Sequence, residues 1–150
     1  MSGGFDRGRR IFVAALAGLA AAALLAAAPI AQAQDVRGVD AQRQARDWLV
    51  LTDRGDGPGS WAAAGRKFRD AITADRWTES LAAVRSPRGA LVQRAVVSTR
   101  FEKSFPGAPD GDYAIVMFRT AFANHAEGGE TLVLEREPDD VWRVVGYSVL

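Results

Sequence analysis

The sequence predicts an α+β domain in which three N-terminal helices pack on a four-stranded antiparallel meander sheet. After residue 33, apolar side chains first recur at the helical spacing of three and four residues. From Leu91 onward they alternate with polar side chains, which is the period of a strand with one buried face. Residues 34–150 are enough to bury about two-thirds of their unfolded surface without disulfide bonds, and the chain has no cysteine.

We expect the first helix over about Asp40 to Arg54. One face of this helix carries a row of mostly apolar side chains, namely Ala41, Ala45, Trp48, Leu49 and Thr52. The glycine- and proline-rich segment 55–59 follows and is expected to end the helix.

Two further helices are expected before residue 89. Ser60 is the predicted N-cap of the second helix, and Thr73 that of the third. The second helix has an apolar face of Trp61, Ala64, Phe68 and Ile72, and the third has one of Trp77, Leu81 and Val84. Each helix thus places one tryptophan on its inner face. These tryptophans are expected in the core, and the alternative is that they line a ligand cavity between helices and sheet.

The second half of the chain is expected to form the sheet. In the first strand one row of side chains, Ala95, Val97, Thr99 and Phe101, alternates with a second row, Arg94, Val96, Ser98, Arg100 and Glu102. The second strand, Tyr113–Phe122, is apolar on both faces, which favours a central position. The last two strands are predicted at Glu130–Glu137 and Val141–Val149. Both parities of the last strand are plausible inward faces, and the strand order stays open.

The first 33 residues have the pattern of a secretory signal peptide. Arg7, Arg9 and Arg10 precede the uncharged apolar run Ile11–Ala28, and Ala31 and Ala33 occupy the positions that a signal peptidase recognises. We expect cleavage after Ala33, a periplasmic or secreted location, and no membrane attachment after cleavage. The alternatives are an uncleaved N-terminal anchor and export by the twin-arginine route rather than the general one.

Composition narrows the chemistry that this chain offers. Without cysteine there is no thiol nucleophile, and a single histidine, His125, gives a structural zinc site too few ligands. The net charge is +1, but residues 1–33 carry +2 and the rest of the chain carries −1, so the remaining domain has no basic footprint for nucleic acid. We therefore expect no cofactor, no metal and no catalytic constellation. A calcium site at Asp110 and Asp112 would have too few oxygen ligands.

The most individual local feature is the segment between the first two expected strands, Phe105–Asp112. Proline presets its backbone and glycine tolerates positive φ angles, so this segment is expected to be a rigid exposed loop. Such loops often carry binding residues, and the alternative is a hairpin connection alone. The candidate binding residues are Pro106, Gly107, Pro109, Asp110, Gly111, Asp112, Tyr113 and, from the last strand, Tyr147.

Several segments together resemble a bacterial exported family, domain of unknown function 4019. They include Trp48-Leu49, Ser60-Trp61 and Phe68-Arg69 in the front half, and Arg85-x-Pro87-x-Gly89, Pro106–Tyr113, Phe122–Asn124, Glu130-Thr131 and Trp142–Tyr147 in the back half. The resemblance implies a small exported protein with no assigned activity, so no functional residue is carried over. The order of elements also resembles the nuclear-transport-factor-2-like and cystatin-like folds, which host unrelated functions.

These observations predict a non-enzymatic cell-envelope domain that binds an envelope protein or a small ligand. One alternative is a cone-shaped fold with a ligand pocket, in which Asp112, Tyr113 or Tyr147 performs proton-transfer or hydrolase-type chemistry. Another is a structural or oligomerising protein that uses its exposed sheet edges. The oligomeric state stays open.

Overall fold

The computed structural model describes residues 36–150. The expected signal peptide and its cleavage site at Ala31 and Ala33 lie outside these residues. The chain divides into two units, Met1–Arg37 and Gly38–Leu150, and the second holds the domain. Among the described residues, no helix has the length and apolar character needed to cross a membrane.

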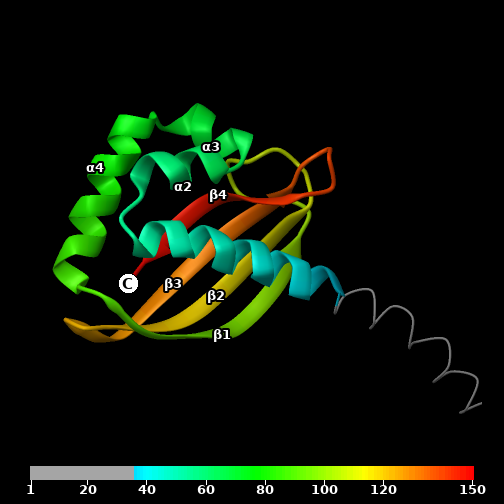
Figure 1. Ribbon diagram of the computed structural model, residues 1–150. Helices are drawn as coiled ribbons and strands as arrows, with labels where there is room; N and C mark the ends of the chain where they lie inside the picture. Colours follow the sequence, from blue (N-terminus) through cyan, green and yellow to red (C-terminus); the bar gives the residue numbers. More distant parts are fainter. Residues whose placement is uncertain (1–35) are drawn as a thin grey trace, which may run out of the picture. The chain divides into compact units, whose positions relative to one another are not determined.

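The domain is an α+β fold in which the helices precede the strands (Figure 1). A first helix over residues 36–53 is followed by α2 (Gly57–Ala63), α3 (Arg66–Ala71), α4 (Ala74–Arg85) and the short 3₁₀ helix η1 (Ser86–Arg88). The strands are β1 (Leu91–Glu102), β2 (Tyr113–Phe122), β3 (His125–Arg136) and β4 (Trp142–Val149). They form one antiparallel sheet in the order β1-β2-β3-β4, so the predicted fold class and the meander are confirmed.

The prediction of a single second helix that begins at Ser60 and extends to Ile72 was wrong, because this part of the chain forms two helices, α2 and α3. Asp56, not Ser60, is the N-cap of α2, and its carboxylate accepts a hydrogen bond from the Gly59 amide at 2.8 Å. Ser60 lies inside α2 and is buried. The chain becomes extended at Ala64 and Gly65, where the Gly65 amide donates to the Val144 carbonyl of β4 at 2.8 Å. A bond to the sheet thus replaces one turn of helix, and the domain has four helices rather than three.

The predicted start of the last helix is confirmed. The Thr73 side chain accepts a hydrogen bond from the Arg76 amide at the start of α4. Trp77 and Leu81 of this helix are buried, as their spacing predicts.

A β-bulge reverses the expected orientation of half of β1. The register with β2 shifts between Val96 and Ser98, so Val97 is an extra residue. Thr99 and Phe101 lie on the face of the sheet that meets the helices, as the alternation predicts. Before the bulge, however, Arg94 and Val96 take that face, and Val97 is exposed.

A second bulge explains why both parities of the last strand are plausible. The register between β3 and β4 shifts at Val133 and Leu134, which leaves Val145 as the extra residue. Trp142 and Val144 are buried in the core before the bulge, and Tyr147 packs against the same core after it.

The core fills the space between the helices and one face of the sheet, here called the inner face. Rings from three helices meet there: Trp48 lies 5.8 Å from Trp77 and 6.1 Å from Phe68, between ring centroids. The Trp48 indole donates to the Ser60 carbonyl and the Trp77 indole to the Ser60 hydroxyl, both at 2.8 Å. Trp61 is only half-buried at the margin of this core. The predicted core role therefore describes Trp48 and Trp77 best.

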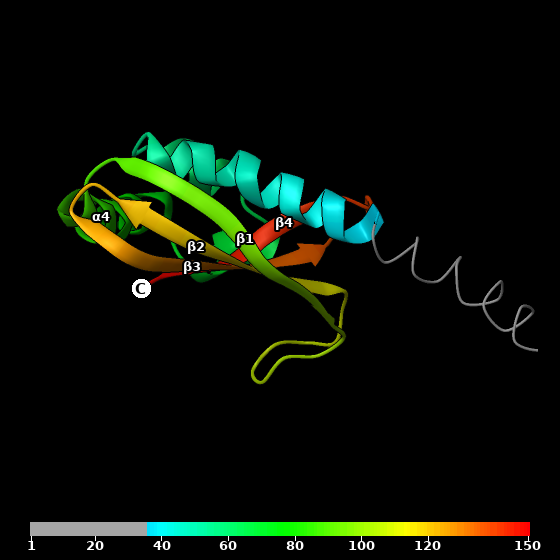
Figure 2. The same ribbon diagram turned by 90° about the horizontal axis from the view of Figure 1, so that it is seen from below.

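The opposite, outer face of the sheet is covered at one end by the segment that links β1 to β2. Residues Phe105–Asp112, here called the Pro/Gly loop, fold back beneath the sheet on the side away from the first helix (Figure 2). The loop thereby forms a small layer on the outer face of the sheet, opposite the first helix (Figure 2).

Candidate functional site

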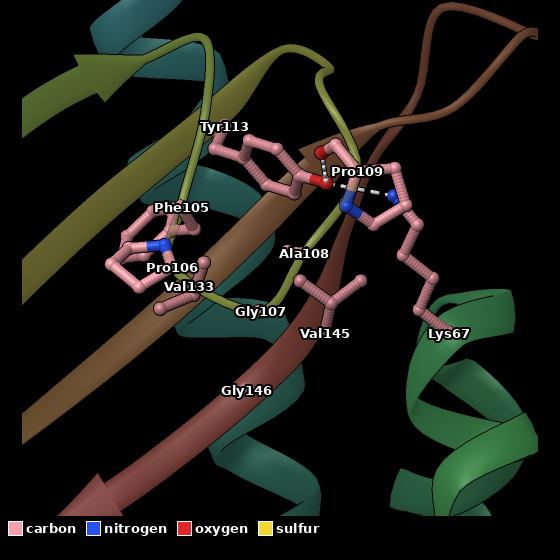
Figure 3. A pocket seen from close by; sticks show the side chains of 10 residues that line it. All are labelled: Lys67, Phe105, Pro106, Gly107, Ala108, Pro109, Tyr113, Val133, Val145 and Gly146. Atoms are coloured by element: carbon pink, nitrogen blue, oxygen red, sulfur yellow. Dashed lines mark hydrogen bonds between the residues drawn. The ribbon is translucent and has the colours of Figure 1, made fainter.

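A pocket of about 460 Å³ lies between the Pro/Gly loop, the outer face of the sheet and helix α3. Its lining is apolar except at one end, where Lys67 and the Tyr113 hydroxyl lie. The lining residues are Phe105, Pro106, Gly107, Ala108, Pro109, Tyr113, Val133, Val145, Gly146 and Lys67. Figure 3 shows the loop crossing over the strands, with Val145 of β4 and Lys67 of α3 closing the side. Residues from α3, the Pro/Gly loop and strands β2, β3 and β4 therefore build one concave surface.

Aromatic packing and local turns shape the loop. The Phe105 ring meets the Tyr113 ring edge-on, with centroids 5.6 Å apart. A short bridge pairs Phe105 with Ala108, and Gly107 between them has a φ of 80°, a conformation that favours glycine. At the base of the loop, Lys103 forms an ion pair with Asp112. These contacts hold the loop against the sheet without a disulfide bond.

The polar end of the pocket is a chain of hydrogen bonds centred on Tyr113 (Figure 3). The Tyr113 hydroxyl donates to the Pro109 carbonyl at 2.7 Å and accepts from the Lys67 ammonium at 2.7 Å. Lys67 also donates to a carboxylate oxygen of Glu135 at 2.6 Å. The hydrogen bonds to Glu135 and Tyr113 raise the pKa of Lys67 above its ordinary value, so the ammonium stays charged at neutral pH.

The structure brings four of the eight candidate binding residues together in this pocket: Pro106, Gly107, Pro109 and Tyr113. Three others, Asp110, Gly111 and Asp112, line a neighbouring groove that also contains Glu135 and Lys103. Tyr147 lies on the inner face of the sheet and shares neither surface.

Sequence reasoning missed Lys67, the one charged group of the pocket. A signal was present, because Lys67 and Lys103 are the two lysines in a chain that otherwise uses arginine as its cation. No local pattern connects Lys67 with a loop that follows it by about 40 residues, and the contact depends on how α3 meets the sheet.

A second polar cluster lies buried between the helices and the inner face. Glu130 is its centre: one carboxylate oxygen accepts from Tyr147 at 2.7 Å, and the other accepts from Arg94 at 2.6 Å and from Thr120 at 2.7 Å. Arg85 lies 3.4 Å from the first oxygen. The Glu130 side chain is 0% exposed.

Asp53 completes this cluster and balances its charge. Arg94 forms two hydrogen bonds to the Asp53 carboxylate, at 2.8 and 2.9 Å, and Arg85 forms one at 2.8 Å. Burial alone would raise the pKa of Asp53, but the two arginines outweigh it and hold this pKa below its ordinary value. Two carboxylates thus meet two guanidinium groups, and the cluster is electrically neutral.

The surroundings of Tyr147 fix its protonation state. Burial raises the pKa of the Tyr147 hydroxyl well above its ordinary value, and the adjacent Glu130 carboxylate raises it further. A protonated phenol that donates to a sealed carboxylate fits a structural role in the core.

The alternative acid/base set of Asp112, Tyr113 and Tyr147 is not brought together. Tyr113 lies on the outer face and Tyr147 on the inner face, so the sheet separates the two hydroxyls. The acidic partner of Tyr147 is Glu130, while the Asp112 carboxylate pairs with Lys103.

The fold and the outer-face pocket define a small α+β protein with a loop-covered concave surface. Residues 44–147 match the family described as Protein of unknown function (DUF4019), and the chain belongs to this family. A comparison with curated proteins found no match, and neither did a comparison with solved structures.

Proposed function

We propose that this chain is an exported cell-envelope domain that binds a small apolar ligand without turning it over. The observation that carries the proposal is the pocket beneath the Pro/Gly loop. Small-molecule sites are concave, of about 300–1,000 Å³, and mostly apolar with a few convergent polar groups. At about 460 Å³, with Lys67 and Tyr113 at one end of an apolar wall, this pocket has that character.

The export part of the proposal rests on the sequence of residues 1–33, with its arginines, apolar run and Ala31-x-Ala33 exit. A periplasmic or secreted location follows from it.

Native mass spectrometry of the exported protein, purified from the periplasm, tests the proposal. We expect a chain with an additional non-covalent mass. Replacing Gly146, which lines the pocket, with valine should remove that mass, because a Cβ at Gly146 meets Val133 only at an ordinary contact distance of 3.5 Å and a larger side chain fills the pocket. Thr131→Val is the matched control, since Thr131 lies on the same face of β3 outside the pocket lining. A ligand mass retained equally in both variants would contradict the proposal.

A second candidate is association with a second copy through the edge strand β1. This strand pairs with β2 alone within the sheet, and it carries exposed apolar side chains at Leu91, Val92 and Val97. Exposed apolar edge strands favour pairing between chains. Light scattering at several concentrations would reveal a dimer, and Val92→Lys should then restore the monomer. A monomer at every concentration would eliminate this candidate.

A further inference from the structure

The pocket beneath the Pro/Gly loop contains a single charged lining group. Among the residues that line it, Lys67 alone carries a charge, and all the others are apolar side chains, glycine or Tyr113. The ammonium stands at the end of the pocket, where α3 meets the loop (Figure 3). A ligand that fills the apolar part therefore brings one end close to Lys67.

The charge of Lys67 is already balanced by a neighbour outside the pocket. The Glu135 carboxylate lies 2.6 Å from the ammonium but belongs to the adjacent groove rather than to the pocket lining. A ligand carboxylate at Lys67 would gain attraction from the ammonium and meet repulsion from Glu135 close behind it. The ligand carboxylate would also lose its hydration on entering the apolar pocket, which is costly for a charged group. A ligand cation would meet Lys67 directly.

The hydrogen-bonding capacity of this end is equally specific. An ammonium has three donor protons, and Lys67 uses two of them within the described chain, on Tyr113 and Glu135. The Tyr113 hydroxyl donates its only proton to the Pro109 carbonyl. The polar side chains of this end thus offer a ligand one remaining donor, the third proton of Lys67.

From this geometry we propose that the pocket selects an uncharged apolar molecule with one hydrogen-bond acceptor, such as a ketone, ester or amide carbonyl, which Lys67 binds. The inference rests on the proposed ligand-binding function and adds the chemical class of the ligand. Lys67 is then the residue that determines specificity, and Glu135 tunes it by neutralising the ammonium.

Three probes of equal chain length test the inference: 2-octanone, octanoate and octylammonium. The exported protein is purified from the periplasm after labelling with [¹³Cε]lysine. Because the chain has two lysines, the spectrum contains one signal from the pocket and one from Lys103, whose side chain is 79% exposed outside it. At pH 7 we expect 2-octanone to shift the Lys67 signal and leave the Lys103 signal in place. We expect it to bind at least tenfold more tightly than either charged probe.

A matched pair of variants tests the hydrogen bond itself. Lys67→Met keeps an apolar stem but removes the donor, and it should weaken 2-octanone binding about tenfold or more in ligand-detected NMR, because a hydrogen bond from a charged group is lost. Arg69→Met removes a cation from an exposed position of the same helix, outside the pocket lining, and should leave the affinity unchanged.

The outcomes separate the inference from the function on which it rests. Tighter binding of octanoate or octylammonium would overturn the inference and leave the ligand-binding pocket in place. Equal 2-octanone affinity in wild type and Lys67→Met would also overturn it. If no probe perturbs the Lys67 signal, the ligand-binding function and the inference both fail. The probe series uses the wild-type protein, so it decides the question even if Lys67→Met does not fold.

Discussion

At the scale of single residues, the buried carboxylate of Glu130 joins several elements of the domain. Tyr147, Arg94 and Thr120 all donate to it, and Arg85 lies within ion-pair distance. Buried ion pairs add little net stability because desolvation offsets their attraction, but removing one partner leaves an uncompensated buried charge. The cluster therefore specifies how the first helix, α4 and the sheet fit together more than it strengthens the fold.

Glu130→Gln should destabilise the domain by about 3–5 kcal/mol, because Arg94 and Arg85 would then share the single carboxylate of Asp53. Urea unfolding measures this difference. Glu127→Gln makes the same change at an exposed position of β3 and should stay within about 0.5 kcal/mol of wild type. Equal midpoints for wild type and Glu130→Gln would contradict a structural role of the carboxylate.

The raised pKa of Tyr147 leads to a prediction of how the stability of the domain depends on alkaline pH. Burial raises the folded-state pKa of Tyr147 above its ordinary value of 10.0. The unfolded chain releases this proton first, so the stability that the protonated phenol contributes is complete below pH 10 and declines as the pH rises beyond it.

The measurement for Tyr147 is urea unfolding of wild type and Tyr147→Phe between pH 8 and pH 11. The difference in unfolding free energy between the two proteins should be constant below pH 10 and change above it in the direction that disfavours wild type. The comparison cancels the contribution of Lys67, whose raised pKa acts in the same pH range in both proteins. A difference that stays constant throughout would show that the phenol ionises normally.

At the scale of elements, short breaks in periodicity shape the molecule. The extra residues Val97 and Val145 each shift a strand by one position, which moves the following side chains to the other face. The first bulge lets Arg94 reach the buried cluster while Phe101 still reaches the core. The second places Val145 at the pocket and Tyr147 in the core.

The beginning of α2 gives a prediction at this scale. Asp56 caps the helix through the Gly59 amide, so Asp56→Ala should cost about 1 kcal/mol of stability. Thermal or urea unfolding measures the loss. Asp47→Ala, at an exposed position within the first helix, is the matched control and should have almost no effect. Equal losses in the two variants would assign the effect to charge rather than to capping.

At the scale of the whole molecule, the described domain has its aromatic core on one face of its sheet and a loop-covered pocket on the other. Aromatic rings and the neutral ion cluster occupy the inner side, while the Pro/Gly loop and Lys67 frame the outer side. Binding at the outer face would therefore leave the packing of the core undisturbed.

The proposed signal peptide gives a prediction about the N-terminus of the whole chain. The exported protein should begin at Gln34, because Ala31 and Ala33 supply the small side chains that a signal peptidase requires. Intact-mass measurement of periplasmic protein checks the cleavage site. Ala33→Lys should block processing, whereas Gln34→Lys, one position beyond the expected site, should leave most of it intact. Exported protein that retains Met1 would contradict cleavage.

The sequence by itself determined the fold class, the cap of α4, the apolar central strand β2 and the loop that separates it from β1. Each of these depends on residues that are neighbours in the chain, so period, capping and turn chemistry reveal them. Tertiary structure decided the split between α2 and α3, since the Gly65 amide finds its partner on β4. It also decided the bulges at Val97 and Val145, the pairing of Lys67 with Tyr113 and Glu135, and the contact of Arg94 with Glu130. These features depend on strand register and on contacts between residues about 35 to 80 positions apart, which no local pattern encodes.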